Sequence, residues 1–200
     1  MLALDGGGIR ALITLQVLAA LESQLRDRLG AGPDFRLSDA FDYIAGTSTG
    51  AIIAAGLARG MSTAELLSFY RSFGRGVFTR RSILELWKSL YGNGPLEQQL
   101  QQTFGAGTTL EPRHLRTLLL VVTRNATTDS AWPISSNPWA KYNDRDRADC
   151  NLRLPLWQVV RASTAAPVYF PPEVVALDPS NSEKRFVFVD GGTTAYNNPA

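Results

Sequence analysis

The chain has 200 residues, enough for a single domain with a substantial hydrophobic core. Its 44% hydrophobic and 19% charged residues are ordinary for a globular protein, and a formal net charge of +2 argues against a nucleic-acid-binding surface. One cysteine, Cys150, excludes an intramolecular disulfide and is compatible with a reducing compartment. No apolar run reaches the length of about 18 residues that indicates a membrane span, and Met1 leads directly into a predicted strand without room for a signal peptide. We therefore expect a soluble, cytoplasmic protein.

Apolar periodicity and turn residues divide the chain into alternating strands and helices. Strands are predicted at 1–4, 43–45, within 116–124, at 131–134 and at 185–189. Helices are predicted at 11–29, from 50 to the capping Gly60, and at 62–73, 82–91, 95–104 and 155–165, with a short helical or turn segment at 37–42. Strands that alternate with helices indicate a layered α/β domain with a mostly parallel sheet.

The stretch from Phe41 to Gly60 carries the most informative motif. A short apolar strand meets the sequence GTSTG (Gly46 to Gly50), and a helix rich in alanine follows at once. Strand, G-x-S-x-G and helix in this order are typical of a nucleophile elbow, in which Ser48 sits at the tip of a sharp turn. Gly46 and Gly50 remove the side chains that would collide there. The alternative is a glycine-rich turn in which the serine has no chemical role.

A glycine triplet, Gly6, Gly7 and Gly8, follows the first predicted strand and opens the first helix. Backbone N–H groups in such a turn can bind an anion, so the triplet is a candidate oxyanion hole for Ser48. A dinucleotide site also fits the glycine spacing, but it requires an acidic residue at the end of a second strand, and Glu22 and Asp27 lie within the helix. Arg10 would either stabilise the loop or meet an anionic group of the substrate, and the remaining alternative is a turn without chemistry.

A nucleophilic serine needs a base, and histidine is the usual one. The single histidine, His114, precedes a predicted strand in a charged stretch, an unfavourable position for this role. Asp190 is the better candidate, because it ends the last predicted strand, where active sites of such sheets gather. Gly191 and Gly192 keep the space beside it open. A turn aspartate without function is the alternative.

Four blocks together resemble the patatin-like phospholipase family. They are LDGGGIR near the N-terminus, GTSTG, RASTAAPVYFPP from Arg161 to Pro172, and DGG followed by YNNPA near the C-terminus, in the family's order and over essentially the whole chain. The resemblance implies a three-layer α/β/α fold and a lipid acyl hydrolase with a Ser-Asp dyad. It assigns Ser48 as nucleophile, Asp190 as its partner and Gly6, Gly7 and Gly8 as the oxyanion loop, with supporting roles for Arg10 and for residues 163–167. The family fold continues beyond the position of Ala200, so we expect a domain over 1–200 that is incomplete at its C-terminus.

A dyad of this kind requires neither a metal nor a cofactor. Asp144, Asp146 and Asp149 resemble half of a calcium-binding loop, but arginines stand between them and the loop glycine is missing, which favours a solvated charged loop. Cys150 has no neighbouring histidine in the sequence and is predicted to be a bystander.

The leading hypothesis is a phospholipase A or lysophospholipase acting on acyl esters. The alternatives are a soluble esterase or thioesterase for smaller acyl substrates, and a non-catalytic lipid-binding module. Peripheral membrane contact through residues 69–91 is a further option, because aromatic and basic side chains alternate there; two ordinary helices with buried aromatic residues are the favoured alternative. The residues concerned are Phe69, Tyr70, Phe73, Phe78, Trp87 and Tyr91 with Arg71, Arg75, Arg80, Arg81 and Lys88.

Overall fold

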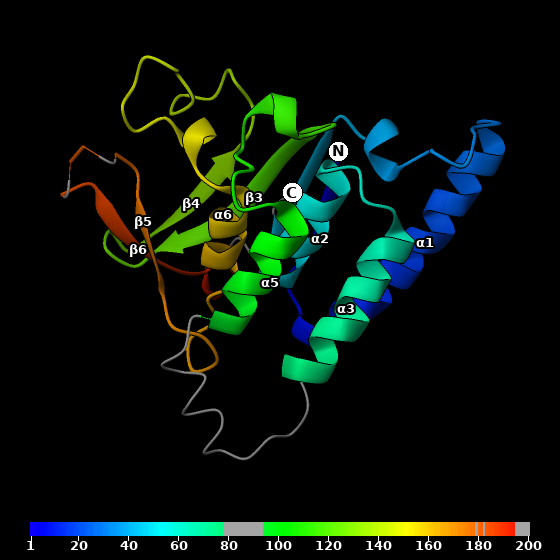
Figure 1. Ribbon diagram of the computed structural model, residues 1–200, viewed down its shortest axis with the longest axis horizontal. Helices are drawn as coiled ribbons and strands as arrows, with labels where there is room; N and C mark the ends of the chain where they lie inside the picture. Colours follow the sequence, from blue (N-terminus) through cyan, green and yellow to red (C-terminus); the bar gives the residue numbers. More distant parts are fainter. Residues whose placement is uncertain (78–93, 179, 182, 195–200) are drawn as a thin grey trace.

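The computed structural model describes residues 1–77, 94–178, 180–181 and 183–194. These residues form a mixed central sheet of six strands with helices packed against it (Figure 1). In chain order the strands are β1 (Leu2–Leu4), β2 (Tyr43–Thr47), β3 (Leu118–Asn125), β4 (Ser130–Ser135), β5 (Glu173–Ala176) and β6 (Arg185–Asp190). Strand β3 contains valine and threonine and β6 contains valine and phenylalanine, residue types that favour strands packed on a core.

Strand β3 is the centre of the sheet, because three strands pair with it. On one edge β4 runs antiparallel along residues 120–125 of β3. On the other edge β2 pairs in parallel with residues 118–122, and β6 pairs antiparallel with residues 123–125. The last residue of β2, Thr47, lies opposite Val122, and the last residue of β6, Asp190, lies opposite Thr123. The C-terminal ends of β2 and β6 therefore lie next to each other along the same edge of β3.

The helices are α1 (Ala11–Arg28), α2 (Thr49–Ala58), α3 (Thr63–Val77), α5 (Gly94–Phe104) and α6 (Leu156–Ser163). Single 3-10 turns lie at Gly8–Arg10, Leu37–Asp39, Pro112–His114, Asn151–Arg153 and Gly191–Thr193. Helices α2 and α6 pack directly on the sheet, α1 and α3 pack together beside α2, and α5 packs on α6 (Figure 1). Helix α2 is buried from Gly50 to Ala58 and forms the middle of the hydrophobic core. None of the described helices combines the length and the mean hydropathy that crossing a bilayer requires.

The α/β class and the parallel arrangement of the strands around the elbow are confirmed. Strands β1, β2 and β3 run parallel, whereas β4, β5 and β6 add antiparallel pairings, so the sheet is mixed. On β3, Leu119 and Val121 are fully buried while Leu118 and Leu120 are half-buried. Helices α2 and α6, which pack on the sheet, also contact each other.

Several predicted elements differ from the structure. Strand β5 was not predicted, because it has only four residues and follows a Pro-Pro pair. Helix α3 continues to Val77, four residues beyond its predicted end. The predicted helix at 82–91 lies outside the described residues. Phe69 and Tyr70 are 8% and 2% exposed and pack into the core, which agrees for these two residues with the favoured expectation of ordinary helices with buried aromatic side chains. The other aromatic residues of that segment lie outside the described side chains.

The turn between β2 and α2 depends on close backbone contact. A Cβ atom on Gly46 would collide with the backbone of Gly50, and a Cβ on Gly50 would collide with the Leu4 and Asp5 carbonyl groups at the end of β1. Backbone atoms cannot move aside as a flexible side chain can. These two glycines therefore let the helix start directly against the sheet, as the sequence predicted.

Gly50→Ala is expected to destabilise the fold by about 1–3 kcal/mol, because the added methyl group overpacks a site enclosed by backbone. Gly32→Ala is the matched control, since that glycine is exposed and a Cβ atom there would meet nothing within 4 Å. Urea unfolding followed by circular dichroism measures both changes. Equal free energies of unfolding for the two variants would mean that the turn can accommodate a Cβ atom at position 50, contrary to the structure.

Candidate active site

Ser48 occupies a strained position at the tip of the elbow. Its backbone has φ 55° and ψ −127°, a conformation that residues other than glycine rarely adopt. Such a residue costs roughly 1–3 kcal/mol and persists only where surrounding contacts enforce it. In this conformation the Ser48 side chain reaches Asp190, the last residue of β6.

The Ser48 hydroxyl donates a hydrogen bond to Asp190. The distance between Ser48 Oγ and Asp190 Oδ2 is 2.6 Å, a value typical of an O–H donor on a charged carboxylate. The other carboxylate oxygen, Oδ1, accepts from the Gly192 N–H at 2.7 Å, so the orientation of the carboxylate is determined from both sides. Asp190 is only 5% exposed.

Ser48 and Asp190 touch because the C-terminal ends of β2 and β6 lie next to each other along β3. Ser48 follows the last residue of β2, and Asp190 is the last residue of β6, at adjacent registers of β3. Gly191 follows in a crowded place, where a Cβ atom would collide with the Val122 carbonyl oxygen and press on Thr47. The predicted pair is therefore brought together by strand register.

The glycine triplet lies beside the elbow. The N–H groups of Gly7 and Gly8 both donate to Thr49 Oγ1, at 3.2 and 3.1 Å. Two backbone donors thus converge on one oxygen atom of the residue next to Ser48. The loop is closed by the Arg10 N–H, which donates to the Gly7 carbonyl at 3.2 Å. Gly6 precedes these donors in the same loop, and the Arg10 side chain is exposed.

Helix α2 begins immediately after Ser48, so its amino end points at the site. The free N–H groups and the partial positive charge of a helix N-terminus stabilise negative charge that develops there. Tyr70 of α3 supports this end of the helix, since its buried hydroxyl donates to the Thr49 carbonyl at 2.7 Å. Burial raises the pKa of the Tyr70 hydroxyl well above its ordinary value, which keeps it a donor.

The other sequence candidates lie elsewhere. His114 stands ahead of β3, at the opposite end of the strands from Ser48, and its Nδ1 contacts the N–H and hydroxyl of Thr109 at 3.1 and 3.0 Å. Asp149 pairs with Arg147 and Lys184 at 2.9 and 3.1 Å. Within the described residues, no cluster of three or more histidine, cysteine, aspartate or glutamate side chains forms a metal site. Cys150 is buried.

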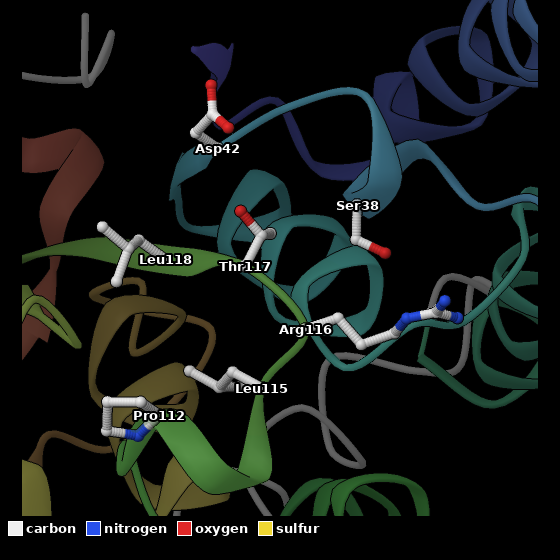
Figure 2. Close-up of a pocket in the computed structure, with 7 residues that line it drawn as sticks. All are labelled: Ser38, Asp42, Pro112, Leu115, Arg116, Thr117 and Leu118. Carbon is white, nitrogen blue, oxygen red and sulfur yellow. The ribbon is translucent and has the colours of Figure 1, made fainter.

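A surface hollow of about 310 Å³ lies at this same far end (Figure 2). It is lined by Ser38, Asp42, Pro112, Leu115, Arg116, Thr117 and Leu118. Figure 2 shows the Arg116 side chain extending away from Asp42, and its guanidinium pairs with Asp39 at 3.0 Å. Asp42 precedes β2 and Leu118 begins β3, so the hollow is separated from Ser48 by the length of the strands. It holds no nucleophile paired with a base.

Sequence reasoning missed the contacts of two hydroxyl groups in the site. Thr49 accepts from the glycine loop, and the buried Ser163 hydroxyl accepts from the Ser48 N–H at 2.8 Å. Both residues lie within sequence blocks that resemble the family, so the sequence indicated the segments in which they occur. Neither block indicates which backbone group each hydroxyl would meet, because those partners are distant in the sequence.

The environment of Asp190 makes it a stronger base than an exposed carboxylate. Burial raises the pKa of Asp190, and the hydrogen bonds from Ser48 and Gly192 lower it by a smaller amount, so the net shift is upward. A higher pKa brings the carboxylate closer to what accepting a hydroxyl proton requires. The site therefore combines a serine hydroxyl, a buried carboxylate that accepts from it, and two amide donors that converge beside them.

The family model described as patatin-like phospholipase matches residues 2–200. The chain belongs to the patatin-like phospholipase family. It is 34% identical to a cGAMP-activated phospholipase of Escherichia coli (strain TW11681), over all of this chain and 53% of that protein. It is also 34% identical to an intracellular phospholipase A2 of Caenorhabditis elegans and 31% identical to Patatin-17 of Solanum cardiophyllum, of which the chain covers 16% and 50%.

The patatin-like fold is also seen in a solved structure. The crystal structure of VipD from Legionella pneumophila matches with a TM-score of 0.54 and 16% sequence identity, over 94% of this chain and 45% of that one. At this identity the likeness shows the fold. The chain spans about half the length of most of these relatives, so the relatives' activities come to it only as proposals.

The raised pKa of Asp190 predicts that Asp190→Asn is more stable than the wild type at neutral pH. A carboxyl group whose folded pKa is raised contributes stability that is complete below its unfolded pKa, near ~3.9, and is lost as the pH rises through the folded pKa. Asparagine carries no charge at any of these pH values. The higher melting temperature that we expect of Asp190→Asn at pH 7 should therefore approach that of the wild type as the pH falls toward 4. Melting temperatures measured from about pH 4 to pH 8 test this linkage.

Asp34→Asn is the control for that comparison, because Asp34 is exposed. A difference in melting temperature between Asp190→Asn and wild type that does not change with pH would contradict the assignment of a buried, charged carboxylate. A higher melting temperature of the wild type at pH 7 would contradict it as well.

Proposed function

We propose that the chain is the catalytic part of a serine lipid acyl hydrolase that cleaves ester bonds of phospholipids or lysophospholipids through a Ser48-Asp190 dyad. The observation that carries the proposal is the 2.6 Å hydrogen bond from the strained Ser48 hydroxyl to a buried carboxylate. Membership of a family whose named relatives include phospholipases supports the choice of a lipid ester as substrate.

In the first step Ser48 Oγ attacks the ester carbonyl carbon while its proton passes to Asp190 Oδ2. The N–H groups of Gly7 and Gly8 transfer from Thr49 Oγ1 to the developing oxyanion, and the amino end of α2 adds its partial positive charge. When the tetrahedral intermediate collapses, Asp190 returns the proton to the leaving alcohol, and an acyl-enzyme remains on Ser48.

In the second step a water molecule attacks the acyl-enzyme. Asp190 accepts the proton of that water, and Ser48 Oγ leaves and recovers a proton as the fatty acid is released. The Gly192 N–H holds Asp190 in place through both steps, because it binds the carboxylate oxygen that does not face Ser48. Orientation of the base, which a third residue supplies in histidine-based triads, comes here from backbone.

Ser48→Ala is expected to abolish both ester hydrolysis and labelling by a fluorophosphonate probe, since the variant removes the nucleophilic oxygen. Asp190→Asn should lower kcat by several orders of magnitude, because an amide cannot accept the hydroxyl proton. His114→Gln is the control and should retain near wild-type turnover, as His114 lies at the far end of the strands. Turnover is measured on phospholipid, lysophospholipid and short-chain nitrophenyl ester substrates.

Undiminished turnover by Ser48→Ala would remove the proposal, and a loss in His114→Gln as large as that in Asp190→Asn would reveal a triad. Activity confined to the short-chain esters would favour a general esterase over a lipid hydrolase.

Gly8→Ala tests the oxyanion loop. Gly8 has φ +58°, a backbone conformation that alanine adopts only with strain, so the variant should move the Gly8 N–H away from its acceptor. We expect kcat to fall toward the ~10²-fold loss typical of removing an oxyanion-hole donor. Gly30→Ala is the matched control, because Gly30 has φ +60°, equally open surroundings and a place at the end of α1. An effect on KM without one on kcat would show that the loop only binds substrate.

A further inference from the structure

Ser163, the last residue of α6, has a hydroxyl whose direction is determined by its two partners. It donates to the Val122 carbonyl at 2.6 Å and accepts from the Ser48 N–H at 2.8 Å. A carbonyl can only accept and an amide N–H can only donate, so the hydroxyl cannot reverse. Ser163 is fully buried, and its bond to the Val122 carbonyl is buried as well. The hydroxyl therefore links the elbow to the middle of β3.

The hydrogen bond from the Ser48 N–H acts on the conformation of the elbow. That N–H group belongs to the strained residue, whose φ of 55° has to be enforced by its surroundings. A donor held at 2.8 Å fixes the plane of the peptide that joins Thr47 to Ser48. The position of that peptide in turn sets where Ser48 Oγ can lie.

The same segment also holds the other member of the dyad. Two residues after Ser163, the Ala165 carbonyl accepts from the Asp190 N–H at 3.0 Å. Residues 163–165 therefore contact the backbone of both Ser48 and Asp190, at the place where β2 and β6 meet. These three residues are called the dyad clasp below.

We propose that the dyad clasp sets the distance between Ser48 Oγ and the Asp190 carboxylate, and that the Ser163 hydroxyl is its positioning residue. The proposal rests on the hydrolase function proposed above and assigns a physical role to one part of the RASTAAP block. Ser163 does not face the reacting atoms; it acts through the backbone of Ser48.

Ser163→Ala removes the acceptor of the part-buried Ser48 N–H and lets the elbow relax. The expected result is a fall in kcat of about 10- to 100-fold with KM unchanged, since misplacing a nucleophile by a fraction of an ångström to 1 Å has effects of this order. The rate of labelling by a fluorophosphonate should fall in parallel.

The pH profile gives a second readout. The hydrogen bond from Ser48 lowers the pKa of Asp190, against the larger effect of burial. When the dyad loosens, that contribution is lost, so the acid limb of kcat should move to higher pH in Ser163→Ala. A purely structural defect would change the fraction of folded protein and leave the limb in place.

Ser136→Ala is the matched control. Ser136 is also fully buried, and its Oγ also accepts from a backbone N–H at 2.8 Å, that of Leu119, away from the dyad. Both variants should lose similar thermal stability, and only Ser163→Ala should lose kcat. Ser163→Cys keeps a weaker donor and acceptor and should fall between wild type and Ser163→Ala; it serves in place of Ser163→Ala if that variant does not fold.

The outcomes separate the two proposals. A Ser163→Ala or Ser163→Cys enzyme with wild-type kcat and an unmoved acid limb, or a Ser136→Ala enzyme impaired to the same degree, would overturn the clasp while the hydrolase function stands. Wild-type protein that neither turns over esters nor reacts with the fluorophosphonate would overturn the hydrolase function and the clasp with it.

Discussion

The meeting of two strand ends along β3 is the constraint on which the site depends. Strand β2 runs parallel to β3 and ends opposite Val122, and β6 runs antiparallel and ends opposite Thr123. Two residues that are 142 positions apart in the chain thereby come within 2.6 Å. No flexible loop intervenes on either side, because Ser48 directly follows its strand and Asp190 ends its own. The precision of the dyad is a property of strand register.

This junction places the site where the backbone is most crowded. Glycine at positions 46, 50 and 191 allows close approaches that a Cβ atom would block, and Ser48 is held in a strained conformation. Asp190 is buried, and its raised pKa means that its ionised form opposes folding at neutral pH. Strain and a buried charge are stability losses that the large apolar core, centred on α2, offsets. The strained conformation of Ser48 is that of the elbow, and the burial of Asp190 is what makes its carboxylate more basic.

In the proposed mechanism, backbone groups perform tasks that side chains perform in histidine-based serine hydrolases. The Gly192 N–H orients Asp190, and the Gly7 and Gly8 N–H groups converge beside the nucleophile. The Ser163 hydroxyl holds the elbow through its backbone as well. Such groups are fixed by the fold and need no reorganisation as charge develops, which suits electrostatic stabilisation of an oxyanion. A dyad without imidazole is chemically coherent under these conditions, because orientation and charge stabilisation do not depend on a third side chain.

The sequence by itself determined the α/β class, most of the helices and strands and the elbow at Ser48, and it indicated Asp190 as the candidate partner at the end of a strand. These follow from local causes: apolar periodicity defines an element within a few residues, and the elbow's steric demand acts over the five residues from Gly46 to Gly50. Only the tertiary structure decided that β6 runs antiparallel to β3, that the short β5 joins the sheet, and that Thr49 and Ser163 meet Gly7, Gly8 and the Ser48 N–H. Strand direction and the partner of a buried hydroxyl depend on which distant segments pack together, and no local pattern of residues carries that information.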